Sequence, residues 1–270
     1  MELRERWVTH TRDGQSMTGL LVTPQAVTEP LPAVVVIQEI WGPDAHIQDV
    51  ARRVATAGYT ALAPDLYSRG TRPEGLRPER IEEMKQFMEE VPAGAWHNQA
   101  AMQEILSQQG DRGRRIGETI GLLFGPRDTD GMLKDLSAWL DYLESAPESR
   151  GKPVGTTGYC MGGALSFLLA TRDRRPRVAL VYYGTAPDPA LMSTIECPVH
   201  GFYGGTDTRI TEQVPAVAAA MKDHGKSYGS TVYASAGHAF FNDSRKSYDV
   251  HAARDAWAVS LGLFNQYLGK

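Results

Sequence analysis

Short apolar runs alternate with amphipathic stretches along most of the chain. Residues 32–38 form a continuous apolar run, which is typical of a strand buried on both faces. Apolar side chains at positions 47, 50, 51 and 54 then repeat at helical spacing, and residues 59–63 form the next apolar run. This order of strand, helix and strand predicts an α/β fold with a mostly parallel central sheet and helices on both faces.

The same alternation continues to the end of the chain. Residues 6–12 and 17–23 each alternate apolar and polar side chains around Asp13 and Gly14, which predicts an opening antiparallel hairpin. Further strands are expected at 152–157, 177–183, 198–203 and 227–233, and further helices at 129–143, 163–170, 212–224 and 249–268.

Residues 66–127 interrupt this rhythm with about sixty residues that lack a strand pattern, too many for a structureless loop in a compact domain. Helical patterns at 79–90, 98–108 and 115–124 predict a helical insertion instead. We therefore expect a single domain over 1–270, in which the insertion at 66–127 covers the mouth of the sheet as a lid. The alternative is a helical excursion that lies away from the site.

Composition narrows the class of protein. The 270 residues carry 42% hydrophobic side chains and a formal net charge of −4 with interspersed signs, unlike the basic stripe of a nucleic-acid-binding protein. Residues 1–6 lack the apolar core of a signal peptide, and no apolar run approaches the roughly 18–20 residues of a membrane span. Two cysteines make no disulfide framework. We expect a cytoplasmic protein with no nucleic-acid or membrane partner.

One pentapeptide carries the clearest chemical signal. Gly158, Tyr159, Cys160, Met161 and Gly162 fit the G-x-nucleophile-x-G turn that joins a strand to a helix. Because this turn is strained and tightly packed, small residues must stand on both sides of the nucleophile. The expected strand precedes the pentapeptide and the expected helix follows it. Cys160 is therefore predicted to be a covalent nucleophile.

A thiol nucleophile needs a base, and the base needs an orienting acid. Asp207 follows the strand expected at 198–203, and His238 follows small residues after the strand expected at 227–233. Nucleophile, acid and histidine then come in the chain order of the α/β-hydrolases. Cys197 stands at the start of a strand, and we expect it to be a small buried side chain. The sequence holds no HExxH, CxxC or GxGxxG pattern, so no metal or nucleotide cofactor is expected.

Five motifs are spread along the chain: Gln38-Glu39-Ile40-Trp41-Gly42, Ala63-Pro64-Asp65-Leu66-Tyr67, Gly158-Tyr159-Cys160-Met161-Gly162-Gly163, Gly205-Thr206-Asp207 and Gly237-His238-Ala239-Phe240. In combination they resemble the dienelactone hydrolase family. The resemblance implies an α/β-hydrolase fold and a Cys160–His238–Asp207 triad that hydrolyses carboxylic esters or lactones through a thioester, without a cofactor. It also implies that Glu39 contacts the resting thiol and helps to form the thiolate.

The position of two further residues predicts an oxyanion hole. Its backbone N–H groups would come from Met161, the residue after the nucleophile, and from Ile40, in a loop after an early strand.

Substrate contacts are predicted from position alone. Family members that act on dienelactone carry arginines for the substrate carboxylate, one of them shortly after the catalytic histidine. In this sequence the fourth residue after His238 is Asn242. The candidate contacts are Trp41, Trp96, Arg69 and Arg245, and the arginines are equally consistent with solvated surface.

Two other functions fit the same scaffold. One is a ligand sensor that does no chemistry, although every member of the triad is present in the sequence. The other is a redox-responsive protein that uses Cys160 as a sensor thiol. A redox sensor usually has a resolving cysteine nearby, and Cys197 lies on a strand that we expect to be buried.

Overall fold

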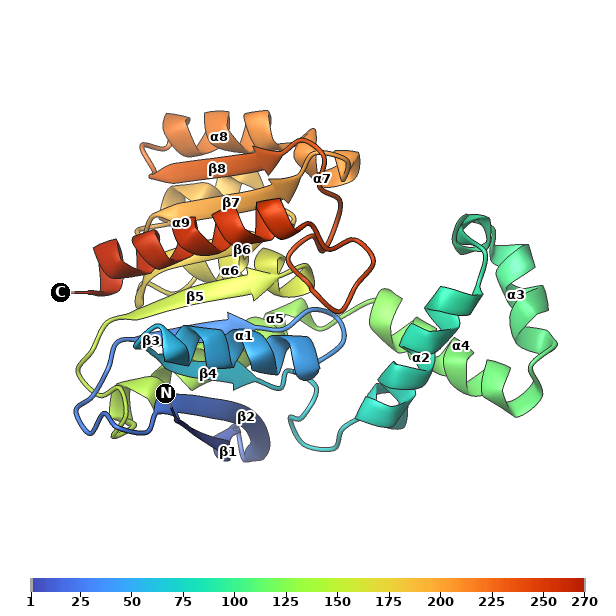
Figure 1. Cartoon of the computed structure of the whole chain (residues 1–270), viewed down its shortest axis with the longest axis horizontal. Helices are drawn as coiled ribbons and strands as arrows, with labels where there is room; N and C mark the ends of the chain where they lie inside the picture. Colours follow the sequence, from blue (N-terminus) through green and yellow to red (C-terminus); the bar gives the residue numbers. More distant parts are fainter. Residues whose placement is uncertain (1, 270) are drawn as a thin grey trace. The chain divides into compact units, whose positions relative to one another are not determined.

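The computed structural model describes residues 2–269. The chain divides into two compact units (Figure 1). One comprises the residues up to Leu66 together with those from Thr129 onward, and the other is Tyr67–Asp128. The first unit carries the sheet, and the second is built of helices and the loops that join them.

An eight-stranded sheet forms the centre of the first unit, in the order β1-β2-β4-β3-β5-β6-β7-β8. β1 and β2 pair antiparallel, as do β2 and β4, and every other neighbouring pair is parallel. The predicted mostly parallel sheet is therefore confirmed. The strands are β1 (Leu3–Arg12), β2 (Gln15–Pro24), β3 (Ala33–Ile37), β4 (Thr60–Pro64), β5 (Val154–Tyr159), β6 (Pro176–Tyr182), β7 (Val199–Gly204) and β8 (Tyr228–Tyr233).

The opening hairpin follows from its two turn residues. Arg12 pairs with Gln15, which leaves Asp13 and Gly14 as a two-residue loop. Both have positive φ, 50° and 75°. A two-residue hairpin loop with two positive φ angles matches the right-handed twist of the strands, and Asp-Gly is among the sequences that adopt it most readily.

Helices cover both faces of the sheet, as the sequence predicted (Figure 1). Val34 and Val36 of β3 pack in one cluster with α1 (Ala45–Thr56) and α9 (Val250–Leu268). Val35 and Ile37 pack in another with α5 (Thr129–Ser145) and α6 (Met161–Ala170). Successive side chains of a strand point to opposite faces, so β3 has to be apolar throughout.

The helix expected at about 212–224 is present within two residues of its predicted ends, and a short helix that was not predicted precedes it. The structure has a short helix α7 (Thr208–Thr211) followed by α8 (Val214–Asp223). Pro215 lies in the first turn of α8. Because proline has no backbone N–H and its ring clashes with a preceding helical turn, it starts a new helix instead of continuing α7.

The second unit confirms that the insertion is helical. It contains α2 (Pro78–Glu90), α3 (Gln99–Ser107) and α4 (Gly110–Phe124), with short 3₁₀ segments at Glu74–Leu76 and Ala93–His97. Met84, Phe87 and Leu123 are fully buried, and Arg115 lies 2.7 Å from Glu83 in an ion pair between α4 and α2. Between residues 2 and 269, no helix is long and apolar enough to cross a membrane.

Candidate active site

Cys160 occupies a sharp turn between β5 and α6. Its φ and ψ are 53° and −113°, a strained conformation for a residue with a side chain. Two backbone hydrogen bonds hold it: its N–H donates to the carbonyl of Tyr182 at 3.0 Å, and its own carbonyl accepts from Ala164 at 3.2 Å. The strand-turn-helix context expected for the pentapeptide is therefore present.

The two glycines of the pentapeptide leave no room for a side chain. A Cβ atom on Gly158 would lie 1.9 Å from the carbonyl oxygen of Gly162. A Cβ atom on Gly162 would lie 2.3 Å from the carbonyl oxygen of Ile37, at the end of β3. The turn thus packs directly against the neighbouring strand, which brings Cys160 close to the residues that follow β3.

His238 and Asp207 meet beyond the carboxyl ends of β8 and β7. The Nδ1 atom of His238 lies 2.6 Å from Oδ2 of Asp207. The carboxylate accepts a hydrogen bond from Nδ1–H, so Nε2 is the ring nitrogen left for a reaction partner. The structure therefore brings together the acid and histidine that the sequence placed after two different strands.

Cys160 is the second hydrogen-bond partner of His238, besides Asp207. Burial alone would lower the pKa of His238, but hydrogen bonds to Asp207 and Cys160 and the charges of both groups raise it to about 10. A partner on each side of the ring thus outweighs the loss of solvent and favours the imidazolium form. The arrangement can deliver a proton to, or remove one from, a group held next to the thiol.

Glu39 follows β3 and is only 2% exposed. Its two carboxylate oxygens accept hydrogen bonds from the hydroxyl of Tyr183 at 3.2 Å and from Nδ2 of Asn242 at 3.0 Å. A buried carboxylate requires such partners. The contact between Glu39 and the resting thiol that the family resemblance implies stays a prediction.

Tyr183 is a site residue that sequence reasoning missed. It is the first residue after β6 and is fully buried, and burial raises its pKa well above the usual range, so its hydroxyl remains a donor to Glu39. Its ring packs edge-on against His238 with centroids 5.1 Å apart, and it also interacts electrostatically with Cys160. The only signal in the sequence was its place at the end of a strand.

Backbone strain concentrates at this site. Among the residues that the structure describes, the non-glycine residues with positive φ are Asp13, Cys160, Tyr183 and Ala239. Asp13 belongs to the hairpin turn, whereas the other three are the nucleophile candidate, the Tyr183 partner of Glu39 and the residue after His238. Such strain persists only where the surrounding structure enforces it, and it often marks a functional site.

The oxyanion-hole candidates lie in two segments, the residues after β3 and the start of α6, which the close packing of Gly162 against Ile37 brings together. Ile40 follows β3, and Met161 is the first residue of α6, where the N–H groups point out of the start of the helix. Trp41 is buried beside Ile40, and the guanidinium carbon of Arg245 lies 5.1 Å from the centroid of the Trp41 ring. Two predicted substrate-binding residues, Trp41 and Arg245, are therefore neighbours.

The other two predicted substrate contacts belong to the second unit. Arg69 lies 3.7 Å from Asp128, and Trp96 packs against the rings of Phe87 and Phe124. Both side chains thus have partners inside their own unit, and their roles toward substrate stay predictions.

Cys197 is buried, as expected, and burial raises the pKa of its thiol to about 11. Within residues 2–269, no three or more His, Cys, Asp or Glu side chains gather where they could hold a metal ion.

Comparison with known proteins assigns the chain to a family. The model of the dienelactone hydrolase family matches residues 17–268. The chain belongs to the dienelactone hydrolase family. A relative from Saccharolobus solfataricus, provisionally named a carboxymethylenebutenolidase, is 33% identical over 254 residues, which cover 94% of this chain and 95% of the relative. A relative from Escherichia coli K12 with the same provisional name is 30% identical over 271 residues, and the alignment covers 95% of this chain and 85% of the relative.

A solved structure of this dienelactone hydrolase family has the same fold. The crystal structure provisionally assigned as a dienelactone hydrolase from Klebsiella pneumoniae superposes with a TM-score of 0.76 at 25% sequence identity, covering 99% of this chain and 100% of that one. The mixed eight-stranded sheet with helices on both faces is therefore an α/β-hydrolase fold, and the family is one of hydrolases.

Proposed function

We propose that this dienelactone hydrolase family member hydrolyses carboxylic esters or lactones through a Cys160–His238–Asp207 triad, without a cofactor. The observation that carries the proposal is the 2.6 Å contact of His238 with Asp207. The positive φ of Cys160 in the turn after β5 supports it. The carboxymethylenebutenolidase name of the curated relatives supports a small lactone or ester substrate.

The reaction proceeds in two steps. His238 holds the proton as an imidazolium, and the sulfur of Cys160 attacks the carbonyl carbon of the ester as a thiolate. The negative charge on the carbonyl oxygen is stabilised by the backbone N–H groups of Ile40 and Met161. As the C–O bond breaks, His238 gives its proton to the departing alkoxide, which leaves as an alcohol, or stays attached when the substrate is a lactone.

Water then completes the cycle. His238 removes a proton from a water molecule, whose oxygen attacks the thioester carbonyl, and the carbon–sulfur bond breaks to release the acid. The cycle ends with the sulfur of Cys160 as a thiolate beside the protonated ring of His238. Asp207 holds the ring in one orientation and stabilises its charged form throughout.

Glu39 has a separate role in this proposal. The carboxylate is buried next to Tyr183, which itself interacts with Cys160. When substrate arrives, we expect Glu39 to help to form the thiolate, as the family resemblance implies. Tyr183 and Asn242 hold the carboxylate in place until then.

The direct test is acyl trapping. The protein is incubated with p-nitrophenyl acetate and then with a slowly deacylated ester, and the peptides are analysed by mass spectrometry. We expect turnover that iodoacetamide abolishes, and acyl mass on the peptide that contains Cys160. Acyl mass on Ser166 or Cys197 would contradict the assignment, and absence of turnover across an ester and lactone panel would favour a ligand sensor.

A redox role for Cys160 is less well supported. The other cysteine, Cys197, is 8% exposed, and burial keeps its thiol protonated at neutral pH. It precedes β7 at the amino-terminal edge of the sheet, whereas Cys160 follows the carboxyl end of β5. A resolving partner for Cys160 would have to come from elsewhere.

A further inference from the structure

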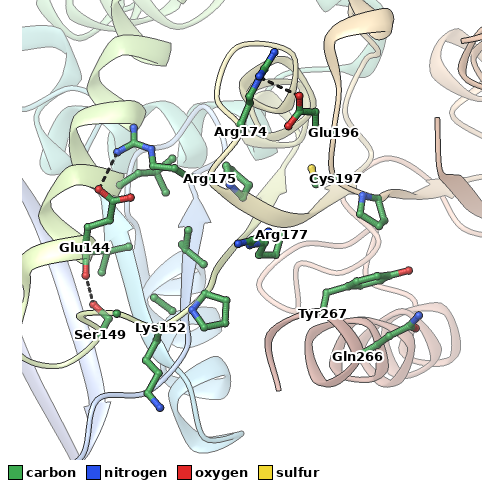
Figure 2. A pocket seen from close by; sticks show the side chains of 18 residues that line it. Glu144, Ser149, Lys152, Arg174, Arg175, Arg177, Glu196, Cys197, Gln266 and Tyr267 are labelled. Atoms are coloured by element: carbon green, nitrogen blue, oxygen red, sulfur yellow. Dashed lines mark hydrogen bonds and ion pairs between the residues drawn. The ribbon is translucent and has the colours of Figure 1, made fainter. Parts of the chain in front are cut away.

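A hollow of about 870 Å³ lies in the first unit, at the edge of the sheet where the parallel strands begin (Figure 2). Cys160 lies at the opposite edge, where β5 ends. It is lined by Ala33, Val154 and Pro176, the first residues of β3, β5 and β6. The triad candidates instead follow the carboxyl ends of their strands. β5 separates the two edges by roughly 20 Å, at about 3.3 Å per residue, so a molecule in this hollow does not touch the triad.

Apolar side chains form much of the lining. Leu140 and Leu143 of α5, with Ala33 and Val154, belong to the buried core beneath one face of the sheet. The rings of Pro153, Pro176 and Pro198 and the side chain of Tyr267 from α9 also line the hollow. This surface suits a flat apolar body of the kind that ligand pockets usually enclose.

The hollow is lined by more positively charged than negatively charged side chains. Its two carboxylates are paired: Glu196 lies 3.0 Å from Arg174, and Glu144 lies 3.7 Å from Arg175. Arg175 also pairs with Asp141 and Asp173.

Two cations, Lys152 and Arg177, remain. Neither side chain has a hydrogen-bond or ion-pair partner in the part of the chain that the structure describes. In Figure 2 Arg177 lies near the middle of the lining residues, between Arg175 and Tyr267.

We propose that this hollow binds a small organic anion, in which a flat apolar body carries a carboxylate or phosphate group. Arg177 binds the anionic group, because its planar guanidinium can donate two parallel hydrogen bonds to such oxygens. Lys152 adds a second positive charge, and the apolar body lies over the proline rings and the side chain of Tyr267. This site is independent of the hydrolase proposal and is distinct from the triad.

The test is isothermal titration calorimetry of the full chain with 1-naphthoate and 1-naphthyl phosphate. Arg177→Gln should weaken binding of whichever anion binds by at least tenfold, because a hydrogen bond to a charged group contributes about 1.5–3 kcal/mol and each 1.4 kcal/mol is tenfold. Lys152→Gln should weaken it severalfold. Lys222→Gln makes the same charge change at an exposed position of α8 outside the hollow, and it should leave the Kd within about twofold.

Control ligands distinguish binding at this site from nonspecific binding of apolar or anionic molecules. Uncharged 1-naphthalenemethanol and inorganic phosphate should each bind at least tenfold more weakly than the better naphthyl anion, and Arg177→Gln should keep the kcat/KM of p-nitrophenyl acetate and the Tm of the parent. No heat with either naphthyl anion at millimolar concentration would overturn the proposal. So would equal binding of the neutral alcohol or of phosphate alone, or an unchanged Kd in Arg177→Gln.

Discussion

Nδ1 of His238 lies 2.6 Å from Oδ2 of Asp207, although 31 residues separate them in the sequence. The two residues follow β8 and β7, which are parallel neighbours in the sheet. Because parallel neighbours end at the same edge, the loops after them meet there. The contact fixes which imidazole nitrogen faces Asp207 and leaves the other for the thiol of Cys160.

The three triad candidates are expected to act as a unit. Cys160→Ala should lower kcat/KM for p-nitrophenyl acetate by roughly 10⁴-fold or more, and His238→Ala by nearly as much. The double variant should then lose little beyond the larger single loss, because either change alone already stops nucleophile activation. Steady-state kinetics of the three variants measures this, and losses that multiply would contradict a shared mechanism.

The raised pKa of His238 makes its contribution to stability depend on pH. The native state holds a proton up to about pH 10, whereas the unfolded chain releases it near 6.5. The stabilisation is therefore complete below about pH 6.5 and is lost as the pH rises toward 10. Urea unfolding of the parent and of His238→Gln should show a difference in unfolding free energy that shrinks between about pH 6 and pH 10.5.

A second variant defines that result. Cys160→Ala removes one of the two hydrogen-bond partners that raise the pKa of His238, so the window should narrow toward pH 6.5. A difference between parent and His238→Gln that stays constant with pH would show that the histidine is not held in its charged form.

Variants of Glu39 and Tyr183 test whether the Glu39 carboxylate takes part in the chemistry or only stabilises the fold. Glu39→Gln should slow the acylation of Cys160 by p-nitrophenyl acetate and lower kcat/KM by about 10²-fold, in the range of general acid-base catalysis. Tyr183→Phe keeps the ring but loses a hydrogen bond to a buried carboxylate, which should cost about 1.5–3 kcal/mol of stability. If Glu39→Gln changes only the Tm and leaves both rates intact, the carboxylate is structural.

Gly162→Ala should prevent the close approach of the Cys160 turn to β3. The added Cβ would lie 2.3 Å from the carbonyl oxygen of Ile37, so the backbone must shift. The free energy of unfolding should fall by about 1–3 kcal/mol or more, as in other overpacked cores. Gly262→Ala is the matched control, because nothing lies within 4 Å of its added Cβ in α9. That change should stabilise the helix by about 0.5–1 kcal/mol. Chemical denaturation measures both, and similar effects at the two sites would contradict the packing argument.

The proposal that the insertion at 66–127 shapes the substrate pocket is tested at Trp96. Phe87 is fully buried, so its truncation would mainly destabilise the second unit, whereas Trp96 is partly exposed. If the insertion is a lid, Trp96→Ala should change kcat/KM differently for short and long acyl esters. Equal effects on every chain length, in a variant that remains folded, would leave the insertion a separate structural unit.

The sequence by itself determined the order of the elements and the triad candidates. The apolar run of β3 requires burial on both faces. The turn at Cys160 requires a glycine on each side, because a larger residue would clash with the backbone. Strand periodicity is a local property, and so is the room at Gly158, where an added Cβ atom would meet the carbonyl oxygen of Gly162. The order of cysteine, aspartate and histidine along the chain, each after a strand, could likewise be recognised without coordinates.

Only the tertiary structure decided which side chains complete the site. Tyr183 and Asn242 reach the carboxylate of Glu39 from 144 and 203 residues away, and no spacing rule predicts such contacts. The ion pairs of Glu144 with Arg175 and of Glu196 with Arg174 also depend on packing between elements. They leave Lys152 and Arg177 without an ion-pair partner among residues 2–269. A charge or hydroxyl in a sequence shows what a residue can donate or accept, whereas the fold decides which groups lie within reach of it.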